Sequence, residues 1–325
     1  HIYDTPDTYI GGIESNNVNQ FIFQDNKIIN KEIEIIPALL NIFNEVLVNA
    51  RDQIVRLNQL YEKDKSIQRV TTIKIDYNPE TKNITVYNDG NGISVDLHNK
   101  EKIYIPQLIF GELLTSSNYK KDEKKIVGGK NGYGAKLVNI FSKNFTITTV
   151  DHIKGKKYTQ TWTDNMTVCN EPTIRVYKNK PFTQISWDLD FERFGIENYT
   201  DDILNLMYRR VYDIAGITDK SVNVYLNNEK IKIKSFLDYV KMYSVTESKK
   251  IINETISDRW EVALTTSDND TFEQVSFVNG IHTSQGGSHV DTICKLIVNH
   301  LSETIKKKHK KEVQDKIIKR YLSIY

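Results

Sequence analysis

Three polar residues that could serve a chemical site are spaced along one predicted helix. Glu45, Asn49 and Asp52 are separated by four and three residues, so at about 100° per residue their side chains fall within a stripe about 60° wide. A solvated helix face is the usual origin of such a stripe, but it favours Lys, Gln or Arg, because Asn and Asp each cost roughly 0.5 kcal/mol of helix propensity. The residue types therefore shift the interpretation toward a functional surface of carboxylates and an amide.

A second candidate follows a predicted strand, where Asp89 is followed by Gly90, Asn91 and Gly92. In isolation this is an ordinary Asp-Gly turn. Its functional interpretation is a strand-end carboxylate that accepts a hydrogen bond from the amino group of adenine, with glycines that let the base approach the backbone. The local sequence leaves both interpretations open.

The third candidate is a glycine cluster. Residues 128–134 contain four glycines within seven positions and precede a predicted helix, whose amide groups could hold phosphates. Neither common nucleotide motif fits: no Gly-Lys-Ser/Thr follows, as in a Walker loop, and no third glycine completes a dinucleotide fingerprint. We therefore expect a phosphate-binding loop of a different design.

A helix and a hairpin must position these candidates. Apolar residues at helical spacing predict a helix from Pro37 to about Tyr61, with the proline at a permitted first-turn position. Alternating residues predict a hairpin with strands over 71–77 and 84–88. The charged segment 119–130 has little to bury, which predicts a loop that leads into a helix over 135–141.

The remaining pattern predicts two domains, 1–228 and 229–325. Five further strands would complete a mixed sheet in the first domain: 145–150, 157–162, 173–176, 183–188 and 222–226. The second domain would contain an amphipathic segment over 236–243, strands near 260–265 and 274–278, and a long terminal helix from about His289.

The composition is that of a folded globular protein. Hydrophobic residues make up 39% and charged residues 26% of the 325 positions, which excludes a fibre and a wholly disordered chain. No apolar run approaches the roughly 20 residues that span a bilayer, so no membrane segment is expected. Cys169 and Cys294 lack the spacing of a zinc site and are interpreted as reduced thiols of an intracellular protein.

The net charge of +2 does not by itself indicate a nucleic-acid partner. A local basic run does stand out, because residues 306–320 contain eight Lys or Arg against only Glu312 and Asp315, on what should be one helix. A solvated face usually accounts for such a run. The alternative is non-specific contact with the phosphates of DNA.

In their order and spacing, the helical stripe, the Asp89 turn and the glycine cluster resemble the three sequence boxes of the GHKL ATPases. Longer strings narrow the resemblance to the eukaryotic-type DNA topoisomerase II family and extend over nearly the whole chain. These strings are residues 6–11, 108–111, 114–119, 131–137, 277–281 and 283–287.

The resemblance implies a role for each candidate residue. Glu45 would be the general base that deprotonates the water attacking the γ-phosphate of ATP, Asn49 would ligate Mg²⁺, and Asp52 would support the nucleotide pocket. Asp89 would read the adenine. Ribose and phosphate contacts and the lid over the triphosphate would come from Ser116, Ser117, Asn118, Lys130, Asn131, Gly132, Tyr133, Gly134, Ala135 and Lys136. These roles agree with phosphoryl-transfer chemistry, in which a metal, amides and a lysine neutralise charge.

The resemblance also implies a fold and a function. The expected fold is α+β: a GHKL (Bergerat) ATPase sandwich with helices on one face of a mixed sheet, followed by an α/β transducer domain. The expected function is the ATPase gate of a type IIA topoisomerase, a nucleotide-dependent homodimer acting on double-stranded DNA, located in the nucleus or, for a large DNA virus, in the infected cell. DNA phosphates would then be contacted by Lys306, Lys307, Lys308, Lys310 and Lys311.

Three positions depart from the usual eukaryotic pattern: Asp89 and Gln53, where Asn is usual, and Lys130, where Arg is usual. These departures concern base and phosphate contacts rather than the class of activity. The family's N-terminal arm, Gln-Thr-Lys loop and DNA-cleavage domain have no counterpart here, so we expect further sequence beyond both ends. Two alternatives are another GHKL ATPase, such as a gyrase subunit, a mismatch-repair ATPase or a chaperone, and a DNA-binding scaffold without turnover, against which Glu45 argues.

Overall fold

The computed structural model describes residues 1–112, 134–243, 250–267 and 269–325. The chain divides into two compact units, His1–Ile233 and Lys234–Tyr325, and each is described by itself. The predicted boundary at residue 228 falls just before the end of the first unit. Strand β11 (Glu229–Lys230) belongs to that unit because it pairs with β10 (Asn223–Leu226) in an antiparallel hairpin.

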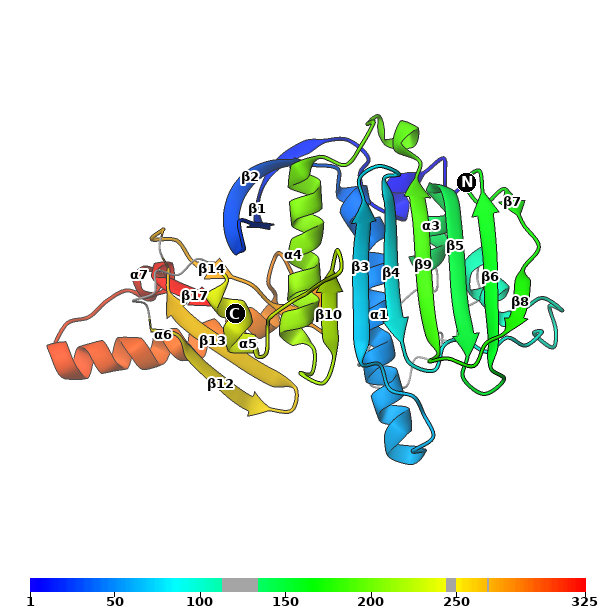
Figure 1. Ribbon diagram of the computed structural model, residues 1–325. Helices are drawn as coiled ribbons and strands as arrows, with labels where there is room; N and C mark the ends of the chain where they lie inside the picture. The colour runs from blue at the N-terminus through cyan, green and yellow to red at the C-terminus, as the bar shows by residue number, and fades with distance from the viewer. Residues whose placement is uncertain (113–133, 244–249, 268) are drawn as a thin grey trace. The chain divides into compact units, whose positions relative to one another are not determined.

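A mixed sheet is the frame of the first unit (Figure 1). Its strands lie in the order β11-β10-β3-β4-β9-β5-β6-β7, and β8 also pairs with β6. The pairing of β10 with β3 is parallel, and the other pairs in this sheet are antiparallel. The strands predicted for this unit are confirmed. Besides β10, their bounds are β3 (Thr72–Asn78), β4 (Asn83–Asp89), β5 (Ser142–Asp151), β6 (Lys156–Thr163), β8 (Thr173–Val176) and β9 (Phe182–Leu189). The two-residue strand β7 (Val168–Cys169) was not predicted.

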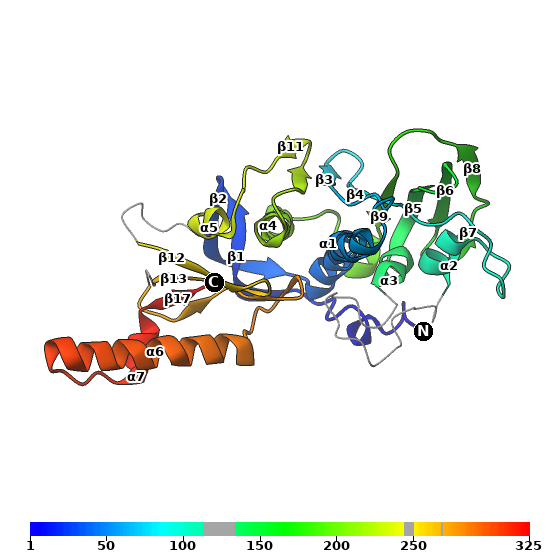
Figure 2. The same cartoon turned by 90° about the horizontal axis from the view of Figure 1, so that it is seen from below.

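Helices cover one face of this sheet, as predicted. The long α1 (Pro37–Lys63) and the short α2 (Ile105–Gly111) and α3 (Gly134–Ile140) lie on the same side in both views (Figures 1 and 2). Alternate strand residues such as Ile84 and Val86 face this side and share one apolar core with the buried side chains of α1. Full burial of each large apolar side chain contributes about 1.5–3 kcal/mol, so this core holds α1 against the sheet.

Besides the short α2, a long hairpin and a second long helix in the first unit were not predicted. Strands β1 (Asn16–Gln24) and β2 (Lys27–Ile35) pair antiparallel around Asp25 and Asn26, whose φ angles of 52° and 60° suit a two-residue hairpin turn. Helix α4 (Asp201–Ile217) packs against this hairpin and against α1. The hydroxyl of Thr200, which caps α4, accepts a hydrogen bond from the amide of Ile203 at 3.3 Å.

The second unit contains a small sheet with strand order β12-β13-β17-β14. The predicted strand over 274–278 is wrong as a single element. Glu273–Gln274 (β14) runs parallel to β17, whereas Phe277–Val278 (β15) forms a separate hairpin with Ile281–His282 (β16). The other elements are α5 (Phe236–Lys241), β12 (Ile252–Ser257), β13 (Trp260–Thr266), α6 (Ser288–His309), α7 (Asp315–Arg320) and β17 (Leu322–Ile324).

The prediction of one helix through residues 306–320 is also wrong. Helix α6 ends at His309, and Lys310 adopts a left-handed φ of 56° that turns the chain before α7 begins at Asp315. Crowding of like charges at helical spacing disfavours continuation. The turn also lets Ile318 and Leu322 enter the core of this unit beside Cys294 of α6.

Among the described residues, none of the helices combines the length and the apolar character needed to cross a membrane.

Candidate active site

The polar stripe predicted on α1 is present, and the start of α3 lies against it. Glu45 and Asn49 are half-buried and Asp52 is buried, with 9% of its surface exposed. A Cβ atom on Gly134 would overlap Oε2 of Glu45 and lie 3.7 Å from Nδ2 of Asn49. Glycine at this position therefore allows the backbone at the start of α3 to approach the stripe closely.

Glu45 has the properties of a proton acceptor. Its side chain makes no hydrogen bond or ion pair with another described residue. Burial raises the pKa of the Glu45 carboxyl above its ordinary value, because a low-dielectric environment disfavours the charged form. A free carboxylate with a raised proton affinity suits general-base chemistry. Asp52 differs, since its Oδ1 lies 3.4 Å from Nη1 of Arg51.

The donors around Asn49 fit a magnesium ion that arrives with a phosphate ligand. In the described part of the chain, His, Cys, Asp and Glu side chains form no group of three that could hold a metal. Mg²⁺ commonly takes one or two protein oxygens and completes its octahedral shell with water and substrate phosphates. The Asn49 amide, with Glu45 one helical turn away, supplies oxygen donors of that kind.

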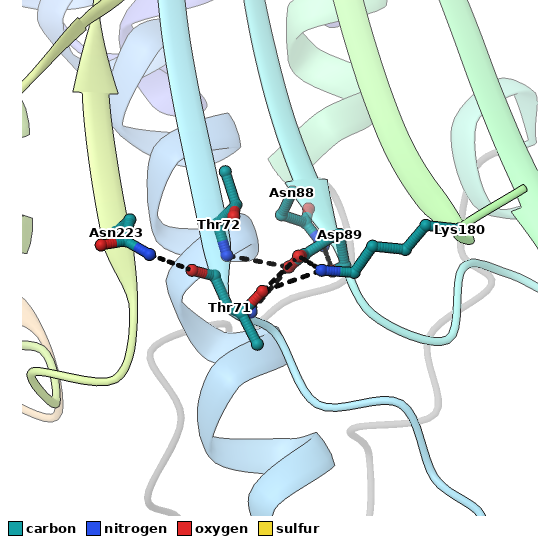
Figure 3. Close-up of polar contacts among 6 residues, drawn as sticks. All are labelled: Thr71, Thr72, Asn88, Asp89, Lys180 and Asn223. Carbon is teal, nitrogen blue, oxygen red and sulfur yellow. Dashed lines mark hydrogen bonds and ion pairs between the residues drawn. The ribbon is translucent and has the colours of Figure 1, made fainter.

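Asp89 ends β4, as predicted, and its carboxylate contacts neighbouring protein groups (Figure 3). Its carboxylate is almost fully enclosed, with 1% of the residue exposed. Oδ1 accepts hydrogen bonds from the amides of Thr71 at 2.7 Å and Thr72 at 2.9 Å. Oδ2 accepts one from the Thr71 hydroxyl at 2.6 Å and pairs with the Lys180 ammonium. These four protein donors occupy the carboxylate, so the geometry does not support Asp89 as the reader of a base.

The neighbouring Asn88 faces the α1 side of the sheet instead. Strand residues alternate between faces, and Asn88 continues the buried series of Ile84 and Val86. Its Nδ2 donates a hydrogen bond to the backbone oxygen of Asp89 at 2.9 Å. Sequence reasoning missed this residue, although a usable signal was present, because Asn88 stands two positions before Gly90 and four before Gly92.

Gly92 is required by a close backbone approach. Its φ is +67°, and a Cβ atom there would overlap the carbonyl oxygen of Val150 and lie 2.7 Å from the carbonyl carbon. The end of β5 therefore packs directly on the turn that follows β4. This packing fixes the path of the chain immediately after Asn88.

Most of the predicted phosphate-contacting residues lie outside the described residues: Ser116, Ser117, Asn118, Lys130, Asn131, Gly132 and Tyr133. Gly134, Ala135 and Lys136 form the first turn of α3. Lys136 is 2% exposed. Burial lowers the pKa of its ammonium group, and the Glu112 carboxylate acts in the opposite direction.

The predicted DNA-contacting lysines all lie in the second unit and are exposed. Lys306, Lys307 and Lys308 are in the last turn of α6, Lys310 is its C-terminal cap, and Lys311 follows in the loop. Lys306 pairs with Glu312 at 2.6 Å and Lys307 with Glu303 at 3.7 Å. These five lysines therefore lie on both sides of the point where α6 ends.

Comparison with known proteins identifies the family. The family model described as DNA gyrase B matches residues 222–322. DNA topoisomerase 2 of Candida glabrata is 47% identical to this chain, and the alignment covers 100% of the chain and 24% of that relative. The chain therefore spans about a quarter of the length of this curated relative.

Solved structures match over a larger share of their length. The crystal structure of the ATPase region of Saccharomyces cerevisiae topoisomerase II is 44% identical, with a TM-score of 0.89, and the match covers 100% of this chain and 82% of that one. The ATPase and transducer domains of Balamuthia mandrillaris DNA topoisomerase II are 36% identical, with a TM-score of 0.88 and coverage of 100% and 81%. This chain belongs to the eukaryotic-type DNA topoisomerase II family, in which it matches the GHKL-type ATPase region.

Proposed function

We propose that this chain binds ATP with Mg²⁺ and hydrolyses it, as the ATPase gate of a type IIA DNA topoisomerase. The observation that carries the proposal is the partly buried Glu45 carboxylate, which has no hydrogen bond or ion pair with any described residue. It lies one turn from the Asn49 amide, on the helix surface that the start of α3 approaches. Membership of the topoisomerase II family supports ATP as the substrate.

Glu45 would remove a proton from the attacking water. The hydroxide oxygen then forms a bond to the γ-phosphorus, the bond from that phosphorus to the bridging oxygen breaks, and the electron pair leaves with ADP. The raised pKa of Glu45 increases its affinity for the transferred proton. When bound at Asn49, Mg²⁺ would neutralise phosphate charge. The ammonium group of Lys136, in the first turn of α3, would add positive charge near the triphosphate.

We assign the recognition of adenine to Asn88 instead of Asp89. The bond from Asn88 Nδ2 to the Asp89 carbonyl orients the amide and leaves Oδ1 as the acceptor for the 6-amino group of adenine. Eukaryotic members usually carry Asn at the base-reading position of this motif, and Asn88 is an Asn. With this assignment, Asp89 no longer counts as a departure from the family pattern. The roles of Asp52, Ser116, Ser117, Asn118 and residues 130–136 are retained from the family resemblance.

Measurement of ATP turnover by this chain tests the proposal. We expect slow phosphate release that requires Mg²⁺ and stops when EDTA is added, because chelation removes the cation that neutralises the phosphates. Calorimetry with a non-hydrolysable ATP analogue separates binding from turnover. ATP binding without Mg²⁺-dependent turnover would favour the scaffold alternative, and the absence of binding would refute the proposal.

The proposal extends to the complete enzyme. There, two copies of the ATPase region would close on nucleotide around a double-stranded DNA segment, and this clamp would drive strand passage, relaxation and decatenation. The setting would be the nucleus, or the infected cell if a large DNA virus encodes the protein. The eukaryotic relatives support this placement.

The exposed lysines around the α6 terminus should contact DNA. Replacing Lys306, Lys307, Lys308, Lys310 and Lys311 with Ala is expected to weaken duplex binding on all sequences alike and to flatten its salt dependence, by roughly one unit of slope for each lost phosphate contact. Fluorescence anisotropy over a salt series measures both effects. As a control, replacing Lys63, Lys65 and Lys100, three exposed lysines of the first unit, should change DNA binding little. If the five-lysine variant bound DNA with unaltered affinity, we would interpret the basic run as an ordinary solvated surface without a role in DNA binding.

A further inference from the structure

The enclosed Asp89 carboxylate joins segments that are far apart in the sequence (Figure 3). Thr71 precedes β3, Asp89 ends β4, and Lys180 lies in the loop before β9. Lys180 Nζ also donates to the Thr71 hydroxyl at 2.9 Å. In turn, the Thr71 carbonyl accepts a hydrogen bond from the amide of Asn223 at 2.8 Å, at the start of β10. Four segments therefore meet at one carboxylate and one threonine.

This cluster restrains the backbone of Asp89. An enclosed carboxylate that lost its partners would be left with a costly unsatisfied charge, and hydrogen bonds to an ionised acceptor are among the stronger ones in proteins. The carboxylate therefore resists displacement from the Thr71 and Thr72 amides. Since side chain and carbonyl belong to the same residue, the position of the Asp89 carbonyl oxygen follows from the same contacts.

That carbonyl oxygen is the acceptor that orients the Asn88 amide. If it moved, Asn88 could rotate and present its NH₂ group to the base instead of its oxygen. An NH₂ group suits a 6-oxo purine, whereas an oxygen suits a 6-amino purine. We infer that Asp89 and Lys180 are a positioning pair that holds Asn88 in the orientation selective for adenine. This inference rests on the proposed function.

Lys180 is the member of the pair that can be tested with least damage to the fold. Its side chain is 54% exposed, and its removal leaves Asp89 with the three donors of Thr71 and Thr72. Lys178, two positions earlier in the same loop, is exposed and makes no hydrogen bond or ion pair with another described residue. Lys178→Met is therefore a matched control for Lys180→Met.

The test compares equilibrium affinities for ATP and for inosine triphosphate, which carries a 6-oxo group, using calorimetry in the presence of EDTA to prevent turnover. Lys180→Met should weaken ATP binding about fivefold, the loss of roughly one net hydrogen bond, with little change for inosine triphosphate. Lys180→Arg should restore the parent preference, and Lys178→Met should keep it. Thermal melts followed by circular dichroism verify that each variant is folded.

The outcomes separate the inference from the function on which it rests. If the parent chain binds both nucleotides equally, or if Asn88→Ala leaves the preference unchanged, recognition of the base by Asn88 is refuted. If the parent prefers ATP, Asn88→Ala abolishes that preference, and folded Lys180→Met retains it, only the positioning role is refuted. A lower melting temperature of Lys180→Met with an unchanged preference would assign the pair a purely structural role.

Discussion

Replacing Glu45 with Gln is expected to preserve ATP binding while turnover falls about 10²–10⁴-fold, the usual contribution of a positioned general base. Glutamine retains the shape of the side chain but does not accept the proton of the attacking water. Phosphate release under saturating ATP measures turnover, and calorimetry with a non-hydrolysable analogue measures binding. Turnover at the parent rate would show that Glu45 is not the base.

The protonation of Glu45 supplies an internal control. Its pKa is raised by burial, so protonation begins at a higher pH than for an ordinary glutamate, and turnover should fall as the pH is lowered through that raised value. Above it, the folded state holds an ionised carboxylate at a desolvation cost that the unfolded chain does not have. Glu45→Gln should therefore be at least as stable as the parent at neutral pH, which separates lost catalysis from lost folding.

Gly92→Ala is expected to destabilise the first unit by about 2–4 kcal/mol. The new methyl group would overlap the Val150 carbonyl, and the φ of +67° is a left-handed conformation, so overpacking and backbone strain add together. The Val150 carbonyl belongs to the backbone, so it cannot move aside by a change of side-chain rotamer. Urea denaturation of this variant and the parent gives the difference in unfolding free energy.

Gly12→Ala is the matched control for that substitution. A Cβ atom at Gly12 meets no atom within 4 Å, and its φ lies outside the left-handed region. We expect a change within about 0.5 kcal/mol, as for ordinary surface substitutions. A Gly92→Ala protein as stable as the Gly12→Ala protein would mean that the turn after β4 can move away from β5.

Local periodicity was sufficient to predict the elements that carry the site. The helical spacing of apolar residues located α1 with its stripe of Glu45, Asn49 and Asp52, and alternation located β3 and β4. The reassignment proposed at Asp89 also depends on alternation. Because side chains change face at every residue, moving the role by one position along β4 moves it to the other face of the sheet. Ile84 and Val86 are buried against α1, and this burial shows which side chains of β4 face the helix. It can be seen only in the packed structure.

Other features had no local signal. Lys180 lies 91 residues after Asp89, and nothing in the sequence around either residue indicates that they pair. The break at Lys310 was missed because the helical pattern continued through charged residues. The position of the turn depends instead on the burial of Ile318 and Leu322 in a core formed with α6. Helix α4, by contrast, had a readable signal in its Thr200 cap and apolar spacing.

The parallel pairing of β10 with β3 has a consequence for folding order. Thr72 and Asn223 are neighbours in the sheet although about 150 residues separate them in the chain, and such non-local pairing slows folding because a long loop must close first. A ribosome must therefore have released nearly all of the first unit before the Thr71 carbonyl finds its partner at Asn223. Nascent chains that end before residue 223 should remain sensitive to proteases at β3, and protection there should arise only after β10 emerges.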